Sequence, residues 1–168
     1  MLKTTVYVSD INNLSDARYC AGMMVDYLGF NIDNIGIDNF REITSWVEGE
    51  IVAEFNSPDE EKINAFLKEF PLDYIAINGT TLPNVNAKII AITNETVEGC
   101  DLQIIDRNIN IDAINHPVLV SGDFKPNEID SIIANKNVKG ICLKGGDELR
   151  PGQKDFDEFA DILEELEN

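Results

Sequence analysis

The chain has 168 residues, of which 43% are hydrophobic, and this length and composition fit one globular domain with a substantial core. With 31 acidic and 13 basic side chains, its net charge is −18, which disfavours binding to nucleic acid or to anionic membrane surfaces. The amino-terminal segment lacks the apolar run of a signal peptide, and no stretch is long enough to span a membrane. The three cysteines are widely spaced, so we expect reduced thiols, no disulfide framework and a cytoplasmic location.

The segment from Val6 to Ala17 predicts a buried strand, a polar turn and the start of a helix. Asn13 is suited to cap that helix, because its side-chain oxygen can accept hydrogen bonds from the first helical N–H groups. A strand that leads through such a turn into a helix is the first unit of a repeating α/β fold. We therefore expect the chemistry of the protein where Ser9 and Asp10 leave the first strand.

Apolar residues at helical spacing predict a second helix over residues 40–47, with Trp46 on its apolar face. In the third helix, Ser57 is the expected N-cap and Pro58 the first helical residue. A further helix is expected over residues 126–134. The last helix carries an apolar stripe made of Phe156, Phe159, Ile162, Leu163 and Leu166.

Eight short apolar runs predict strands, and each is followed by a helix or a brief connector. This is the count of a closed (β/α)8 barrel, although that fold typically needs about 250 residues. The missing length lies in shortened or missing helices after strands four, five and six. We predict one domain over residues 1–168, a compact (β/α)8 TIM barrel, with an open doubly wound sheet as the alternative. The predicted strands cover residues 6–9, 25–30, 50–55, 74–78, 88–92, 102–106, 117–121 and 138–143.

Several motifs occur at the strand ends in a characteristic order. Residues 7–17 match the pattern K-x-C-G-I-T-N-x-x-D-A in part, and residues 121–127 match an A-G-G-L turn followed by Pro-Asn. The most specific match is PGQKD at residues 151–155, which has the form P-G-x-K-D. In their order and spacing these motifs resemble the phosphoribosylanthranilate isomerases, small (β/α)8-barrel enzymes of tryptophan biosynthesis. The resemblance covers essentially the whole chain.

The resemblance implies an isomerase site with an altered base. The family uses a cysteine base after strand one and an aspartic acid after strand six, and these positions hold Ser9 and Asp106 here. A serine hydroxyl titrates far above neutral pH, so Ser9 would need a neighbouring base. Asp106 matches the family's acid, but an aspartate at a strand end is often only a turn cap. We interpret His116, at the entry to strand seven, as structural.

The resemblance also implies a ligand site at the turns after strands one, seven and eight. Glycines in those turns leave backbone N–H groups accessible to a phosphate. Aspartates at the ends of strands one, six, seven and eight, including Asp147, would instead repel an anion. We interpret them as solvated loop residues, and a Mg²⁺ or Ca²⁺ site is the alternative. The candidate ligand-binding residues are Asp10, Gly122, Asp123, Gly145 and Gly146.

We therefore predict a barrel protein similar to these isomerases that has lost their reaction and keeps a small-ligand or partner-binding role. One alternative is an active isomerase with an atypical base, which would be an intramolecular oxidoreductase. Another is a structural interaction module, favoured if Ala76, Ile77, Leu82 and Val85 form an apolar patch. No cofactor and no bound metal are expected. The expected partner is a small molecule, without nucleic acid or membrane, and the chain is expected to be a monomer or homodimer.

Overall fold

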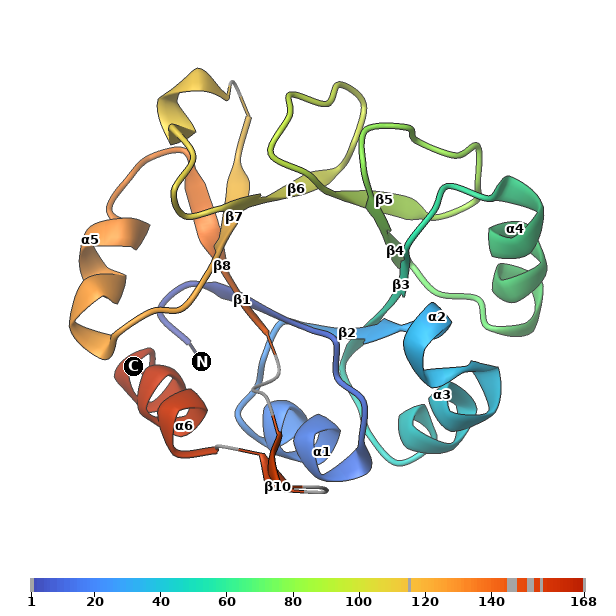
Figure 1. Ribbon diagram of the computed structural model, residues 1–168, viewed down its shortest axis with the longest axis horizontal. Coiled ribbons are helices and arrows are strands. Elements are labelled where there is room, and N and C mark those ends of the chain that lie inside the picture. Colours follow the sequence, from blue (N-terminus) through green and yellow to red (C-terminus); the bar gives the residue numbers. More distant parts are fainter. Residues whose placement is uncertain (1, 115, 145–147, 151–152, 155, 168) are drawn as a thin grey trace.

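The computed structural model describes residues 2–167 apart from 115, 145–147, 151–152 and 155. Eight strands close into a barrel in the order β1 to β8, and neighbouring strands run parallel (Figure 1). The predicted (β/α)8 TIM barrel is confirmed, and the open sheet is wrong. The strands are β1 (Thr5–Ser9), β2 (Tyr27–Asn31), β3 (Glu50–Phe55), β4 (Tyr74–Asn78), β5 (Lys88–Ile92), β6 (Leu102–Asp106), β7 (Val118–Ser121) and β8 (Val138–Lys144).

Helices cover the two sides of the barrel unequally (Figure 1). Between β4 and β7, the described residues outside the strands are irregular connectors except for one short 3₁₀ helix, η1 (Ile111–Ala113), so the predicted loss of helices is confirmed. A small antiparallel pair, β9 (Glu148–Arg150) and β10 (Gln153–Lys154), follows β8. The other elements are α1 (Leu14–Gly22), α2 (Ile32–Ile35), α3 (Ile37–Thr44), α4 (Glu60–Glu69), η1 (Ile111–Ala113), η2 (Pro126–Glu128), α5 (Ile129–Ile133), β9 (Glu148–Arg150), β10 (Gln153–Lys154) and α6 (Phe156–Glu165).

The core has two layers, because parallel strands in a barrel are buried on both faces. Around β2 and β3, on what we call the helix-covered side, phenylalanine rings pack in the outer layer, between the strands and the helices. The ring centroid of Phe66 lies 5.3 Å from that of Phe40, 5.4 Å from that of Phe55 and 4.9 Å from that of Phe70. The inner layer fills the barrel with Tyr7, Val52, Ala76, Ile90, Leu102, Ile104, Leu119 and Cys142.

Around β5 and β6, on what we call the loop-covered side, irregular connectors cover the strands, and the side chain of Gln103 holds them by hydrogen bonds. Its side chain is fully buried, and Nε2 donates to the carbonyl oxygens of Thr93 at 2.8 Å and Glu95 at 2.7 Å. Its Oε1 lies 2.6 Å from Nε2 of His116, which donates because the amide oxygen can only accept. His116 therefore has a structural contact, and one amide holds two of the short connectors against β6.

Several sequence-based boundaries and caps differ from the structure. Asn13 caps α1 as predicted, since its Oδ1 accepts from the Asp16 N–H at 2.9 Å. The cap of α4 is Asp59 rather than Ser57, so Pro58 lies before the helix. Trp46 follows the end of α3 and is 69% exposed, so its predicted place on a packed face is wrong. Residues 126–134 form a 3₁₀ turn and a short α-helix rather than one continuous helix.

The expected apolar patch on the loop-covered side is wrong in its main members. Ala76 and Ile77 are fully buried, Ala76 in the inner layer and Ile77 in the outer one. Leu82 and Val85 are partly buried and pack against the outer core. Within the described residues, no helix has the length and apolar character needed to cross a membrane.

Candidate functional site

A pocket of about 240 Å³ lies at the carboxyl ends of the strands, the end at which (β/α)8 enzymes hold their sites. We call it the mouth pocket. It combines two aliphatic walls with hydroxyl, thiol, ammonium and carboxylate groups. Its lining consists of Ser9, Ile92, Ile104, Ser121, Gly122, Asp123, Cys142 and Lys144.

Three of the sequence-predicted residues, Ser9, Gly122 and Asp123, line the mouth pocket. Asp106 ends β6, but it is not among the residues of that lining. Its Oδ1 accepts from the N–H of Asn108 at 2.8 Å, so this carboxylate caps its own turn. Gly145 and Gly146, and with them Asp147, lie outside the described residues.

The sequence reasoning missed Glu54, whose side chain lies inside the barrel and is 3% exposed. Its Oε2 accepts from the Tyr7 hydroxyl at 2.6 Å, and its Oε1 accepts from the Asp10 N–H at 2.9 Å. Asp10 has a φ of 56°, a left-handed conformation that aspartate tolerates in turns. A Cβ at Gly29 would lie only 2.7 Å from both Glu54 Oε2 and the Tyr7 hydroxyl. The neighbouring strand therefore requires glycine beside this pair.

Burial raises the pKa of Glu54 to about 7, because the charged carboxylate loses its hydration. The hydrogen bonds from Tyr7 and Asp10 and the positive charge of Lys144 lower this pKa, but they do not offset the burial. Burial, followed by the charge of Glu54, also raises the pKa of Tyr7 well above its usual value. Of the two groups, Glu54 is thus the one that changes its charge near neutral pH.

Cys142 is the thiol in the mouth pocket. Burial, and then the charge of Glu54, raise its pKa far above the ordinary value for a thiol, while a hydrogen bond from Ser9 acts weakly against them. A thiol with so high a pKa stays protonated at neutral pH and is a poor base. The thiol in the lining of the mouth pocket is therefore neutral at neutral pH.

An arginine from the connector after β6 packs against the turn after β7. The guanidinium of Arg107 donates to the carbonyl oxygen of Asp123, pairs with Glu128 at 3.0 Å and lies 5.3 Å from the centre of the Phe124 ring. A Cβ at Gly122 would lie 2.7 Å from Arg107 Cδ, so the backbone and the arginine are in close contact. The positive charge of Arg107 is therefore already paired with a carboxylate beside this turn.

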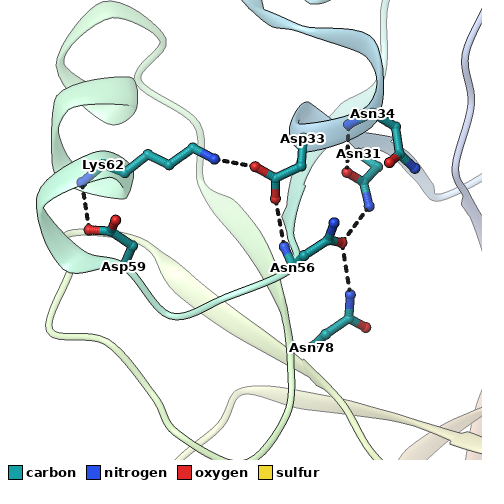
Figure 2. Close-up of polar contacts among 7 residues, drawn as sticks. All are labelled: Asn31, Asp33, Asn34, Asn56, Asp59, Lys62 and Asn78. Atoms are coloured by element: carbon teal, nitrogen blue, oxygen red, sulfur yellow. Dashed lines mark hydrogen bonds and ion pairs between the residues drawn. The ribbon is translucent and has the colours of Figure 1, made fainter.

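Asparagines connect the ends of β2, β3 and β4 (Figure 2). The amide nitrogens of Asn31 and Asn78 donate to Asn56 Oδ1 at 2.9 and 3.3 Å. The backbone N–H of Asn56 donates to Asp33 at 2.8 Å, and Lys62 forms an ion pair with that carboxylate (Figure 2). This network fixes the rim of the barrel opposite β6 and β7.

The predicted acidic side chains do not form a metal centre in the described part of the chain. No group of three or more His, Cys, Asp or Glu residues there is arranged to hold an ion. Asp10 Oδ1 accepts from the side-chain amide of Asn34 at 3.3 Å, and Asp106 caps its own turn. The described residues therefore give no support to the Mg²⁺ or Ca²⁺ alternative.

A second, larger cleft, of about 1230 Å³, lies between α4 and the connector before β5. It contains the starts of three strands, at Glu50, Tyr74 and Lys88. The ammonium group of Lys88 lies 5.3 Å from the centre of the Tyr74 ring. Because the cleft lies at the amino ends of the strands, which serve stability in such barrels, we place the functional site at the mouth pocket.

No family model matches the sequence. The chain is 28% identical over 116 residues to an N-(5'-phosphoribosyl)anthranilate isomerase from Gloeothece citriformis. That match covers 65% of this chain and 50% of the isomerase, so the chain aligns with half the length of this curated relative.

Solved structures of such isomerases share the fold. Monomers generated from the dimeric phosphoribosylanthranilate isomerase of Thermotoga maritima match with a TM-score of 0.77 and 19% identity, over 97% of this chain and 98% of theirs. An isomerase in complex with reduced 1-(o-carboxyphenylamino)-1-deoxyribulose 5-phosphate matches with a TM-score of 0.77 and 18% identity, over the same shares. At these identities, the structural likeness shows the barrel fold.

Proposed function

We propose that this chain, a relative of the phosphoribosylanthranilate isomerases, binds a small molecule in the mouth pocket and does not catalyse the isomerase reaction. The observation that carries the proposal is the state of Ser9 and Cys142. Proton abstraction needs a base whose pKa is near the working pH. A serine hydroxyl does not provide one, and the buried Cys142 thiol stays neutral because burial raises its pKa.

The size and charge of the mouth pocket also favour a ligand that is smaller and less anionic than the one named in the solved isomerase complex. The ligand named in the solved isomerase complex carries a carboxyphenyl group and a phosphate. The mouth pocket, at about 240 Å³, is below the roughly 300–1,000 Å³ that is usual for drug-sized ligands. Its lining holds one acidic residue, Asp123, and one basic residue, Lys144, and Arg107 is already paired with Glu128. The lining therefore has no excess of positive charge for a doubly anionic ligand.

An isomerase assay with freshly generated phosphoribosylanthranilate tests the proposal. We expect no turnover by the unmodified protein and none by a Ser9→Cys variant, because the substrate site has changed along with the base. Turnover by the unmodified protein that Asp106→Asn abolishes would contradict the loss of activity. Turnover gained only by Ser9→Cys would contradict the altered substrate site.

One observation favours the second candidate, an active isomerase with an atypical base. Glu54 has a pKa near 7 and accepts a hydrogen bond from the residue that follows Ser9. In that case Glu54→Gln should abolish turnover in the same assay. The monomeric or dimeric state and the cytoplasmic location stay predictions.

A further inference from the structure

We propose that the mouth pocket binds a small aliphatic α-amino acid in its zwitterionic form. The ligand carboxylate pairs with Lys144, the ligand ammonium group pairs with Asp123, and the ligand side chain lies on the buried floor of the pocket. This inference rests on the proposed function and deepens it, because it names the class of small molecule that the pocket binds.

Two opposite charges lie on neighbouring strands at the rim of the mouth pocket. Ser121 of β7 is paired in register with Cys142 of β8. Asp123 follows Ser121 by two residues, and Lys144 follows Cys142 by two residues. Both charged residues line the pocket and are exposed, and in the part of the chain that the structure describes neither has an ion-pair partner. A ligand with one negative and one positive charge complements both of them.

The two hydroxyl groups of the lining favour a ligand ammonium group. Ser121 Oγ donates its hydrogen to the carbonyl oxygen of Ile105 at 3.2 Å. Ser9 donates its hydrogen to the sulfur of Cys142. Because these hydrogens are already used, each hydroxyl oxygen can only accept a hydrogen bond from a ligand. Together with the carboxylate of Asp123 they offer three acceptor groups, which matches the three N–H donors of a primary ammonium group.

The floor of the mouth pocket is apolar and small. Ile104 is 3% exposed and Cys142 is 4% exposed, and Ile92 adds a further apolar side chain. A hydrocarbon side chain placed there leaves water without leaving a polar group unpaired. At roughly 30 Å³ for each water-sized group, a volume of about 240 Å³ accommodates about eight non-hydrogen atoms, as many as valine has. The pocket therefore fits an amino acid with a short aliphatic side chain.

Calorimetric titration with L-valine and two of its analogues tests the proposal. Isobutylamine lacks the carboxylate of valine, and isovalerate lacks its ammonium group. We expect saturable binding of valine at one site and binding about fivefold to tenfold weaker for each analogue, because each loses one charge-assisted hydrogen bond at an exposed rim. Absence of valine binding would overturn the proposal. Isovalerate that binds as tightly as valine would overturn the zwitterionic class, but it would leave small-molecule binding in place.

Two rim variants assign each ligand charge to its partner. Lys144→Met should weaken valine binding about fivefold to tenfold without weakening that of isobutylamine, which has no carboxylate. Asp123→Asn should weaken valine binding to a similar degree without weakening that of isovalerate, which has no ammonium group.

Each rim variant has a control with the same change of charge. Lys139 lies on β8 and Asp130 on α5, and both are exposed away from the lining of the mouth pocket. Lys139→Met and Asp130→Asn should therefore bind valine as the unmodified protein does. Equal valine affinity in all four variants would overturn the assignment of valine to the mouth pocket. None of these titrations uses phosphoribosylanthranilate, so this proposal and the loss of the isomerase reaction fail separately.

Discussion

The outer faces of the barrel strands are covered by packed helices on one side of the molecule and by hydrogen-bonded connectors on the other. Around β2 and β3, helices α3 and α4 bury the strands under packed aromatic rings. Around β5 and β6, where helices are missing, a buried glutamine and several loop residues hold irregular connectors against the strands by hydrogen bonds. A barrel strand therefore needs a cover and satisfied polar groups, but the cover need not be helical.

The helical cover and the hydrogen-bonded cover differ in how much folding stability is lost when one residue is replaced. Aromatic packing contributes in proportion to the apolar area removed from water, so loss of a ring leaves a cavity. A buried amide contributes little in net terms, but its removal leaves its buried partners without hydrogen bonds. The helix-covered side should therefore show the larger single-residue effects on stability.

Phe66→Ala should give the largest effect, since Phe66 is 4% exposed and contacts three other rings. We expect the free energy of unfolding to fall by about 3–5 kcal/mol in urea denaturation. Trp46→Ala is the control: this side chain is 69% exposed, and its loss should change stability by at most about 0.5 kcal/mol. If Phe66→Ala lowers the free energy of unfolding by less than Gln103→Leu, described below, the helix-covered side is not the more sensitive one.

Glu54→Gln should stabilise the inner layer of the helix-covered side, and only at higher pH. The pKa of Glu54 is about 7 in the folded protein, above its ordinary value, so the folded state holds this proton more tightly than the unfolded state. The stabilising contribution of the protonated carboxyl is complete below about pH 4.5 and is lost as the pH rises through 7.

At pH 8 the Glu54→Gln variant should therefore exceed the unmodified protein by about 3 kcal/mol in unfolding free energy, with little difference at pH 4. Denaturation at the two pH values measures this. A difference that is constant with pH would contradict the titration of Glu54.

Gln103→Leu should have the smallest effect of the three, and it tests the loop-covered side directly. It leaves the carbonyl oxygens of Thr93 and Glu95 and the ring of His116 without their partner, at a cost of about 1–3 kcal/mol. Hydrogen exchange should rise in both connectors. Thr93→Ala, which removes one exposed hydrogen bond in the same loop, is the control and should leave the exchange of the second connector unchanged.

Much of the fold was predictable from local patterns. Runs such as residues 89–91 and 140–143 are buried on both faces, as strands of a covered parallel sheet must be, and Asn13 acts through a capping bond within its own turn. The apolar spacing continues past Thr44, where the helix ends, so it predicts the wrong environment for Trp46. A periodic pattern shows which face is apolar, but it does not show where a helix stops.

The candidate site was only partly predictable. Ser9, Gly122 and Asp123 follow strands directly, so the topology brings them to one end of the barrel. Glu54 and Gln103 lie within strands that are buried on both faces, where neighbouring residues do not reveal whether a side chain points inward or outward. Their roles depend on partners far along the chain, such as Tyr7, 47 residues before Glu54.

The close approach at Gly29 links three positions that are distant in sequence. Because the space of a Cβ at Gly29 is filled by Glu54 and Tyr7, we expect these three positions to change together among homologues. A homologue with a larger residue at position 29 should also have replaced Glu54, and one that keeps all three should keep the buried carboxyl. Gly29 is therefore a marker by which relatives of this chain can be sorted from sequence alone.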